Sequence, residues 1–172
     1  MKRGWTYAVA AALLGLLAGC EGRGHYSSVP DAFVYIQVNV PVYYPHLNGI
    51  GFSECFTKDD INVTQQNRDN WVQATGYGGV LVYAAPSANP DNLSGVEYQA
   101  YDMCCPNELD PDVRVWPDST GIYAVCEQCG SRFDLSSYGM AASASNPSKE
   151  NLKRHYATRV GNILTVTQRY ND

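Results

Sequence analysis

The sequence predicts an all-β domain built from antiparallel strands. Apolar side chains recur at every second residue, as in Val34, Ile36, Val38 and Val40, and no stretch beyond the first 20 residues shows a helical stripe. Gly, Pro, Asn and Asp interrupt the chain at short intervals, and 13 residues are tyrosines, which favour strands. Short strands between frequent turns are typical of an antiparallel sandwich or barrel.

The alternating pattern places the strands in order along the chain. After the run at 33–40, strand-like runs lie at 71–75, 79–84, 96–101, 113–116, 121–125, 132–135 and 155–160. Gly161-Asn162 is a two-residue hairpin signal, so we expect the chain to turn there into a last strand at 163–167. Loops are expected in the proline-containing segments 86–95, 106–112 and 138–151.

The first 31 residues divide into a signal and a tether. Lys2 and Arg3 precede an uncharged run at 7–18, which is the layout of a secretory signal and is too short for a lasting membrane span. The ending Leu17-Ala18-Gly19-Cys20 resembles a bacterial lipobox, and this resemblance implies cleavage before Cys20 and attachment of acyl chains such as palmitate. Glu21 rather than Asp then favours the outer over the inner membrane of the cell envelope. We therefore predict a lipoprotein signal peptide at 1–19, a polar, lipidated tether at 20–31 and a β domain at 32–172.

Length and charge restrict the class of protein. Removal of residues 1–19 leaves 153 residues, enough for one domain whose core does not depend on disulfides. The removal takes away two of the 12 basic residues and none of the 17 acidic ones, so the net charge becomes −7. This charge argues against nucleic acid as a partner. The expected partners are a lipid membrane, through Cys20, and an unidentified redox or envelope protein.

Six cysteines in an exported chain require an explanation. With Cys20 lipidated, five remain, and because five is odd at least one of them is free, bound to metal or paired outside the chain. These five are Cys55, Cys104, Cys105, Cys126 and Cys129. Cys104-Cys105-Pro106 and Cys126-Glu127-Gln128-Cys129-Gly130-Ser131 are separated by about two strands of chain. We expect these two cysteine loops to present ligands to one metal centre.

These loops and their flanking strands resemble a Rieske-type iron-sulfur domain over residues 32–168. The resemblance implies an antiparallel β-sandwich with two hairpin loops at one tip, each giving one Cys and one His to a 2Fe-2S cluster. Cys105 and Cys126 match the family cysteines, whereas Asn107 and Cys129 stand at the two histidine positions. Ser131 matches a family serine whose hydroxyl bonds a bridging sulfide. The chain is therefore a divergent member of this pattern, in which both ligand histidines are replaced.

Three functions are consistent with that departure. In the first, Cys105, Cys126 and Cys129 hold an atypical 2Fe-2S cluster for electron transfer or redox sensing, with a fourth ligand from Cys104, Asn107 or Glu108. In the second, the domain binds no cluster and is a binding or structural module stabilised by disulfides.

The third function is a structural zinc site. Cys126, Cys129 and Gly130 have the spacing of a zinc knuckle, but the first loop lacks a second cysteine at that spacing. Neighbouring Cys104 and Cys105 point to opposite faces of an extended chain, which argues against a site made of four cysteines. We expect an electron carrier or binding module in all three cases, not an enzyme. His46 and His155 match no family ligand and are expected to be surface or hydrogen-bonded structural residues.

Overall fold

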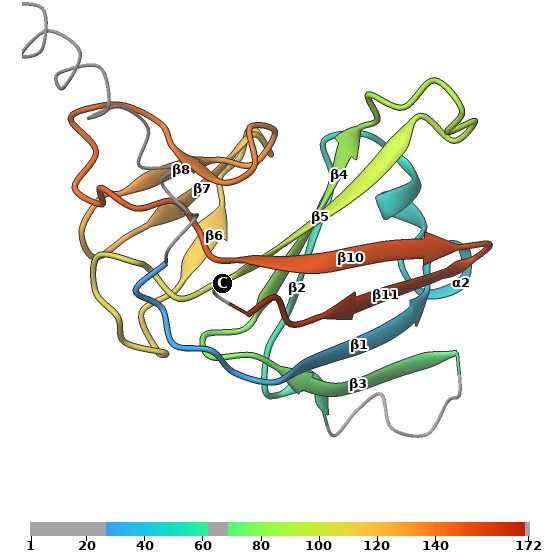
Figure 1. Ribbon diagram of the computed structural model, residues 1–172, viewed down its shortest axis with the longest axis horizontal. Helices are drawn as coiled ribbons and strands as arrows, with labels where there is room; N and C mark the ends of the chain where they lie inside the picture. The colour runs from blue at the N-terminus through green and yellow to red at the C-terminus, as the bar shows by residue number, and fades with distance from the viewer. Residues whose placement is uncertain (1–26, 62–68, 171–172) are drawn as a thin grey trace, which may run out of the picture.

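The computed structural model describes residues 27–61 and 69–170 (Figure 1). Of these, 41% lie in strands and 7% are helical, so the predicted all-β class with antiparallel sheets is confirmed. The predicted signal peptide, Cys20 and the beginning of the tether lie outside the described residues. Among the residues that are described, no helix is long and apolar enough to cross a membrane.

The larger sheet has seven strands and is curved into a nearly closed, barrel-like form. Its order is β2-β4-β5-β10-β11-β1-β3, and every neighbouring pair is antiparallel. The strands are β1 (Val34–Asn39), β2 (Ser53–Phe56), β3 (Asn70–Thr75), β4 (Val80–Pro86), β5 (Val96–Asp102), β10 (Arg154–Val160) and β11 (Ile163–Thr167). A short helix, α2 (Val40–Tyr43), and a 3-10 turn, η1 (Pro45–Asn48), follow β1.

The smaller sheet has four antiparallel strands in sequence order and lies to one side of the larger one, on the left in Figure 1. These strands are β6 (Val115–Pro117), β7 (Tyr123–Cys126), β8 (Arg132–Asp134) and β9 (Met140–Ala141). The expected sandwich is therefore two antiparallel sheets of unequal size, of which the larger nearly closes on itself.

The strands predicted from the alternating pattern are all present, with bounds shifted by one or two residues. The hairpin at Gly161-Asn162 is confirmed, because Val160 pairs with Ile163 across it and Gly161 has a φ of +59°. The pattern missed β2, whose four residues are half-buried except for Phe56, and the two-residue β9. Both are too short to show a period of two.

Strand β4 is buried on both faces and separates two cores. Val80, Val82 and Ala84 point into the barrel, where they pack with the inward side chains of β1, β5 and β11. Leu81, Tyr83 and Ala85 point the other way and pack against the small sheet. The second core also contains Cys105 and Cys126, both fully buried. The predicted cysteine site therefore lies at the junction between the two sheets.

The predicted tether ends earlier than the sequence indicates. Ser28 binds the Glu150 carboxylate through its backbone N–H and its hydroxyl, at 2.7 and 2.6 Å, and Val29 is fully buried. The buried Lys153 ammonium donates to the Val29 carbonyl at 2.9 Å and forms an ion pair with Asp31. Residues 27–31 are thus part of the packed domain, because their polar groups find partners there that composition alone does not reveal.

The buried carboxylate of Asp102 connects the end of β5 to the β3–β4 turn. It accepts hydrogen bonds from the backbone N–H groups of Tyr77, Gly78 and Cys104 at 3.0, 2.9 and 2.8 Å. A Cβ on Gly78 would lie 2.3 Å from the Cys104 nitrogen, so only glycine permits this close approach. Asp102 thereby fixes the backbone just before Cys105.

His155 lies beside this carboxylate, with its Nε2 at 3.7 Å from Asp102 Oδ2. Both side chains are 1% exposed, and neither ring nitrogen of His155 has a hydrogen-bond partner within the described residues. The expectation that His155 is a surface or hydrogen-bonded residue is therefore wrong. Its position at the start of β10, opposite Ala100 of β5, turns the ring into the molecule.

Asp102→Asn is expected to lower the free energy of unfolding by about 2 kcal/mol or more, measured by urea denaturation. An amide presents one acceptor and one NH₂ group to three buried N–H donors, so at least one donor loses its partner. Asp91→Asn, in an exposed loop, is the matched control and should change stability little. Equal stability of Asp102→Asn and the control would contradict this account.

Candidate metal centre

Three cysteine sulfurs converge at the junction of the two sheets. The Sγ atoms of Cys105, Cys126 and Cys129 all lie within 4.8 Å of one another, and those of Cys105 and Cys129 are 3.6 Å apart. Thiolates at about 2.3 Å from a tetrahedral ion would lie roughly 3.8 Å from each other, whereas a disulfide needs about 2.05 Å. The described cysteines are all free thiols. The three sulfurs could therefore hold a metal ion.

Antiparallel backbone pairing closes both cysteine loops. In the first loop, Cys104 and Arg114 form an isolated antiparallel β-bridge, and the Cys105 N–H donates to the Val113 carbonyl at 3.0 Å. These pairings enclose residues 106–112. The second is the β7–β8 turn, in which the Cys126 N–H donates to the Ser131 carbonyl at 2.9 Å. The two loops become neighbours because β6 runs directly out of the first and pairs Val115 with Cys126.

The environment of the three thiols is uneven. Cys105 and Cys126 are fully buried in the second core, whereas Cys129 is partly exposed. Burial raises the pKa of Cys105, opposed by a hydrogen bond from the Asn107 backbone N–H. Burial also acts to raise the pKa of Cys129, but hydrogen bonds from the Ser131 hydroxyl and backbone N–H, together with those from the Cys105 and Cys126 thiols, outweigh it, so that pKa is lowered. Cys129 is thus the member whose thiolate the protein stabilises.

Ser131 contacts the site as predicted, but through a cysteine sulfur. Its Oγ lies 3.0 Å from Cys129 Sγ and accepts a hydrogen bond from the Ser148 backbone N–H at 2.9 Å. The side chain is fully buried. Ser131 therefore links the partly exposed ligand to the loop that precedes β10.

Cys104 and Asn107 do not join the three sulfurs. Cys104 Sγ contacts the carbonyl oxygens of Asp110 and Cys105, at 3.5 and 3.7 Å, and is not part of the group of three sulfurs. Burial, with the nearby Asp102 and Asp110 charges, raises its pKa to about 12. The exposed Asn107 side chain donates to Glu108 Oε1 at 3.0 Å. Cys104 and Asn107 are therefore not in place as a fourth ligand, and Glu108, the third candidate, also lies outside the group of three sulfurs.

The remaining cysteine and histidine of interest lie elsewhere. Cys55 sits in β2 opposite Leu81, and burial together with the Glu54 and Asp60 charges raises its pKa to about 12. His46 forms an ion pair with Glu54, with 3.1 Å between Nε2 and Oε2. Neither His46 nor His155 contributes to the cysteine site, in agreement with the sequence prediction.

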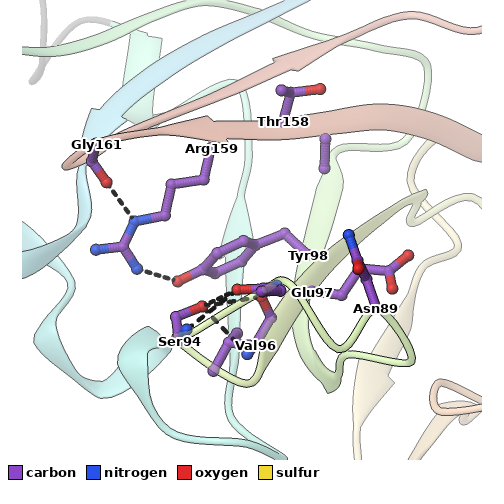
Figure 2. Close-up of a pocket in the computed structure, with 10 residues that line it drawn as sticks. Asn89, Ser94, Val96, Glu97, Tyr98, Thr158, Arg159 and Gly161 are labelled. Atoms are coloured by element: carbon purple, nitrogen blue, oxygen red, sulfur yellow. Dashed lines mark hydrogen bonds between the residues drawn. The ribbon is translucent and has the colours of Figure 1, made fainter.

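A separate pocket of about 480 Å³ lies between the β4–β5 loop and β10, far from the cysteine loops (Figure 2). Arg159 lies along one wall, where its guanidinium donates to Tyr98 Oη at 2.7 Å and to the Gly161 carbonyl at 2.9 Å. Asn92 and Ser94 are hydrogen-bonded to each other within their own loop. These contacts hold the pocket walls together.

Comparison of the chain with protein-family models, with curated proteins and with solved structures finds no match in any of the three.

Ser131→Ala should lower the free energy of unfolding by about 1–2 kcal/mol, because it removes the acceptor of the buried Ser148 N–H. The measurement is urea denaturation of the reduced, metal-free protein. Ser145→Ala, on the exposed part of the same loop, is the control and should be close to neutral. Equal effects of the two substitutions would rule out the structural role of Ser131.

Proposed function

We propose that this chain is a metal-binding β domain of the bacterial cell envelope, in which Cys105, Cys126 and Cys129 hold a single zinc ion. The observation that supports the proposal is the mutual proximity of the three sulfurs, each within 4.8 Å of the other two. Zinc binds thiolates in tetrahedral geometry and undergoes no redox change, so it suits a buried thiolate site in an exported protein.

The geometry favours one ion over a 2Fe-2S cluster. Such a cluster takes four ligands, two on each of two irons, so its ligand atoms fall into two separate pairs. In the family pattern, position 105 is a cysteine ligand of one iron and position 129 is a histidine ligand of the other iron. Here their sulfurs are only 3.6 Å apart, which suits two ligands of the same ion.

The proposed role of the ion is to stabilise the junction between the sheets. Cys105 follows β5 of the large sheet, whereas Cys126 ends β7 and Cys129 lies in the β7–β8 turn of the small sheet. An ion bound to all three therefore cross-links the two sheets at the edge of the second core. The free energy of binding then becomes free energy of folding.

Electron transfer through a Rieske-like 2Fe-2S centre is the second candidate. It is favoured by one observation: three residues at the family ligand positions converge, and Ser131 contacts one of them. In that case the domain would serve a redox protein partner in the envelope. Thiolates in place of imidazoles would lower its reduction potential relative to histidine-ligated centres.

Residues 24–172, expressed without the signal and purified anaerobically, are expected to contain one zinc per chain, no acid-labile sulfide and no visible colour. At a free zinc concentration a hundredfold above Kd, the ion should add about 2.7 kcal/mol to the free energy of unfolding. Metal analysis, sulfide assay and thermal unfolding with and without chelator provide the measurements. Cys105→Ser should abolish the effect of zinc, whereas Cys55→Ser should preserve it.

Iron with equimolar sulfide would instead support the electron carrier. Absence of metal, together with a disulfide detected by thiol counting, would support the disulfide-stabilised module and contradict both metal-based functions.

The envelope location rests on the lipobox resemblance at Cys20. We expect Cys20→Ala to abolish labelling by radioactive palmitate and to release the protein from the membrane fraction of a bacterial host, since the modified thiol is lost. Cys55→Ala is the control and should be labelled like the unaltered chain. Palmitate labelling that persists in Cys20→Ala would refute the lipid anchor.

A further inference from the structure

The two cysteine loops share one backbone design. In the second loop, the carbonyl of Cys126 accepts a hydrogen bond from the N–H of Gly130, four residues later, at 2.8 Å. In the first loop, the carbonyl of Cys105 accepts a hydrogen bond from the N–H of Leu109, also four residues later, at 3.0 Å, and a further one from the N–H of Glu108 at 3.1 Å. Each loop is therefore a turn of the same length that begins at a buried cysteine.

The residue that ends each turn has a left-handed backbone. Gly130 has a φ of +75°, which glycine adopts without strain. Leu109 has a φ of +57°, a conformation that L side chains rarely adopt, and Tyr138 is the only other such residue within the described chain. A leucine held in this conformation indicates that the surrounding structure enforces the turn despite its cost.

Superposition of the two turns in sequence places Glu108 opposite Cys129. Cys129 is the third residue after Cys126, and Glu108 is the third residue after Cys105. A side-chain hydrogen bond also joins the two loops, since Gln128 Nε2 donates to Glu108 Oε2 at 3.1 Å. Glu108 is half-buried, whereas Asn107, the residue at the family histidine position, is exposed.

The alternatives for a fourth ligand are less suitable. Cys104 Sγ contacts the Asp110 carbonyl and lies outside the group of three sulfurs. Its backbone N–H donates to the buried Asp102 carboxylate, so a backbone rotation that brought the side chain to the site would break that contact. Asn107 offers only a neutral amide oxygen, whereas carboxylate oxygen is an established zinc ligand.

We propose that Glu108 supplies the fourth ligand of the metal site, so that the centre consists of two matched turns, Cys105-x-x-Glu108 and Cys126-x-x-Cys129. This assignment rests on the proposed metal-binding function. In the structure the Glu108 carboxylate is held by Gln128 and Asn107 outside the group of three sulfurs, and binding requires its side chain to rotate toward them. The site would then be closed, as in structural zinc centres.

The test is titration of the reduced protein with Co²⁺, followed by displacement with Zn²⁺, in a series of variants. Co²⁺ bound to thiolates absorbs in the visible and near-ultraviolet, and the near-ultraviolet intensity increases with the number of thiolates. Glu108→Gln should weaken metal binding by at least the roughly tenfold that loss of an outer-shell partner costs. Glu108→Cys should retain tight binding and raise the near-ultraviolet intensity to that of a four-thiolate site.

Glu127→Gln is the matched control. It removes the same charge from the second turn, but Glu127 is exposed and does not occupy the proposed ligand position. It should leave the affinity within about twofold of the unaltered protein, and so should Cys104→Ser. Circular dichroism of each metal-free variant checks that the fold is retained, and Glu108→Cys keeps the test valid if Glu108→Gln is unstable.

Three results would overturn the assignment. If the unaltered protein binds Co²⁺ and loses it in Cys105→Ser, but Glu108→Gln binds equally well, the metal site stands and the fourth ligand is wrong. If Glu127→Gln and Glu108→Gln weaken binding equally, the effect of Glu108 is one of surface charge. If the unaltered protein binds no metal, the proposed function fails and the assignment fails with it.

Discussion

The cysteine site depends on the way one buried carboxylate holds the backbone around it. Asp102 accepts three backbone N–H groups, and its own N–H donates to the carbonyl of Lys153 at 2.8 Å. The β3–β4 turn, the last residue of β5 and the chain entering β10 are thereby joined at one point. Because peptide donors surround it, a charge that is costly to bury becomes a structural constraint. The chain leaves that point with Cys105 directed toward the small sheet.

Burial of the thiols and their proximity are consequences of the same arrangement. Cys105 belongs to the apolar layer that also includes Met103, Cys126 and Phe133, and burial there raises its pKa, so ionising the Cys105 thiol without a counter-charge is unfavourable. Cys129 stands at the edge of this layer, where Ser131 stabilises its thiolate. A cation bound between the three sulfurs would supply the counter-charge that a buried thiolate lacks, and it would bind the Cys129 thiolate that the protein already stabilises. This is the physical reason for reading the cluster as a metal centre and not as packing alone.

The sequence predicted the parts of the fold that follow from periodicity and turn chemistry. Alternation located β1, and the Gly-Asn pair located the last hairpin, since both signals come from adjacent residues. It also grouped Cys105, Cys126 and Cys129 in one candidate site, whereas Cys104 remained a possible fourth ligand although an extended chain sets it on the face opposite Cys105. The closure of the large sheet, the docking of residues 27–31 and the burial of His155 arise from contacts between distant segments, which local patterns do not contain. Glu108 was one of three candidate fourth ligands in the sequence, beside Cys104 and Asn107, and periodicity did not separate them. The turn geometry favours Glu108, which follows Cys105 by three residues as Cys129 follows Cys126.

If Cys20 carries the proposed lipid, the early docking of the chain onto the domain limits how far the domain can move from a membrane. With a lipid at Cys20 and Ser28 fixed to Glu150, eight peptide units separate the two points, a reach of at most about 28 Å at full extension. That distance is similar to the diameter of a small domain. A protein anchored in this way works as a component of the membrane surface, and any partner must approach that surface to engage it.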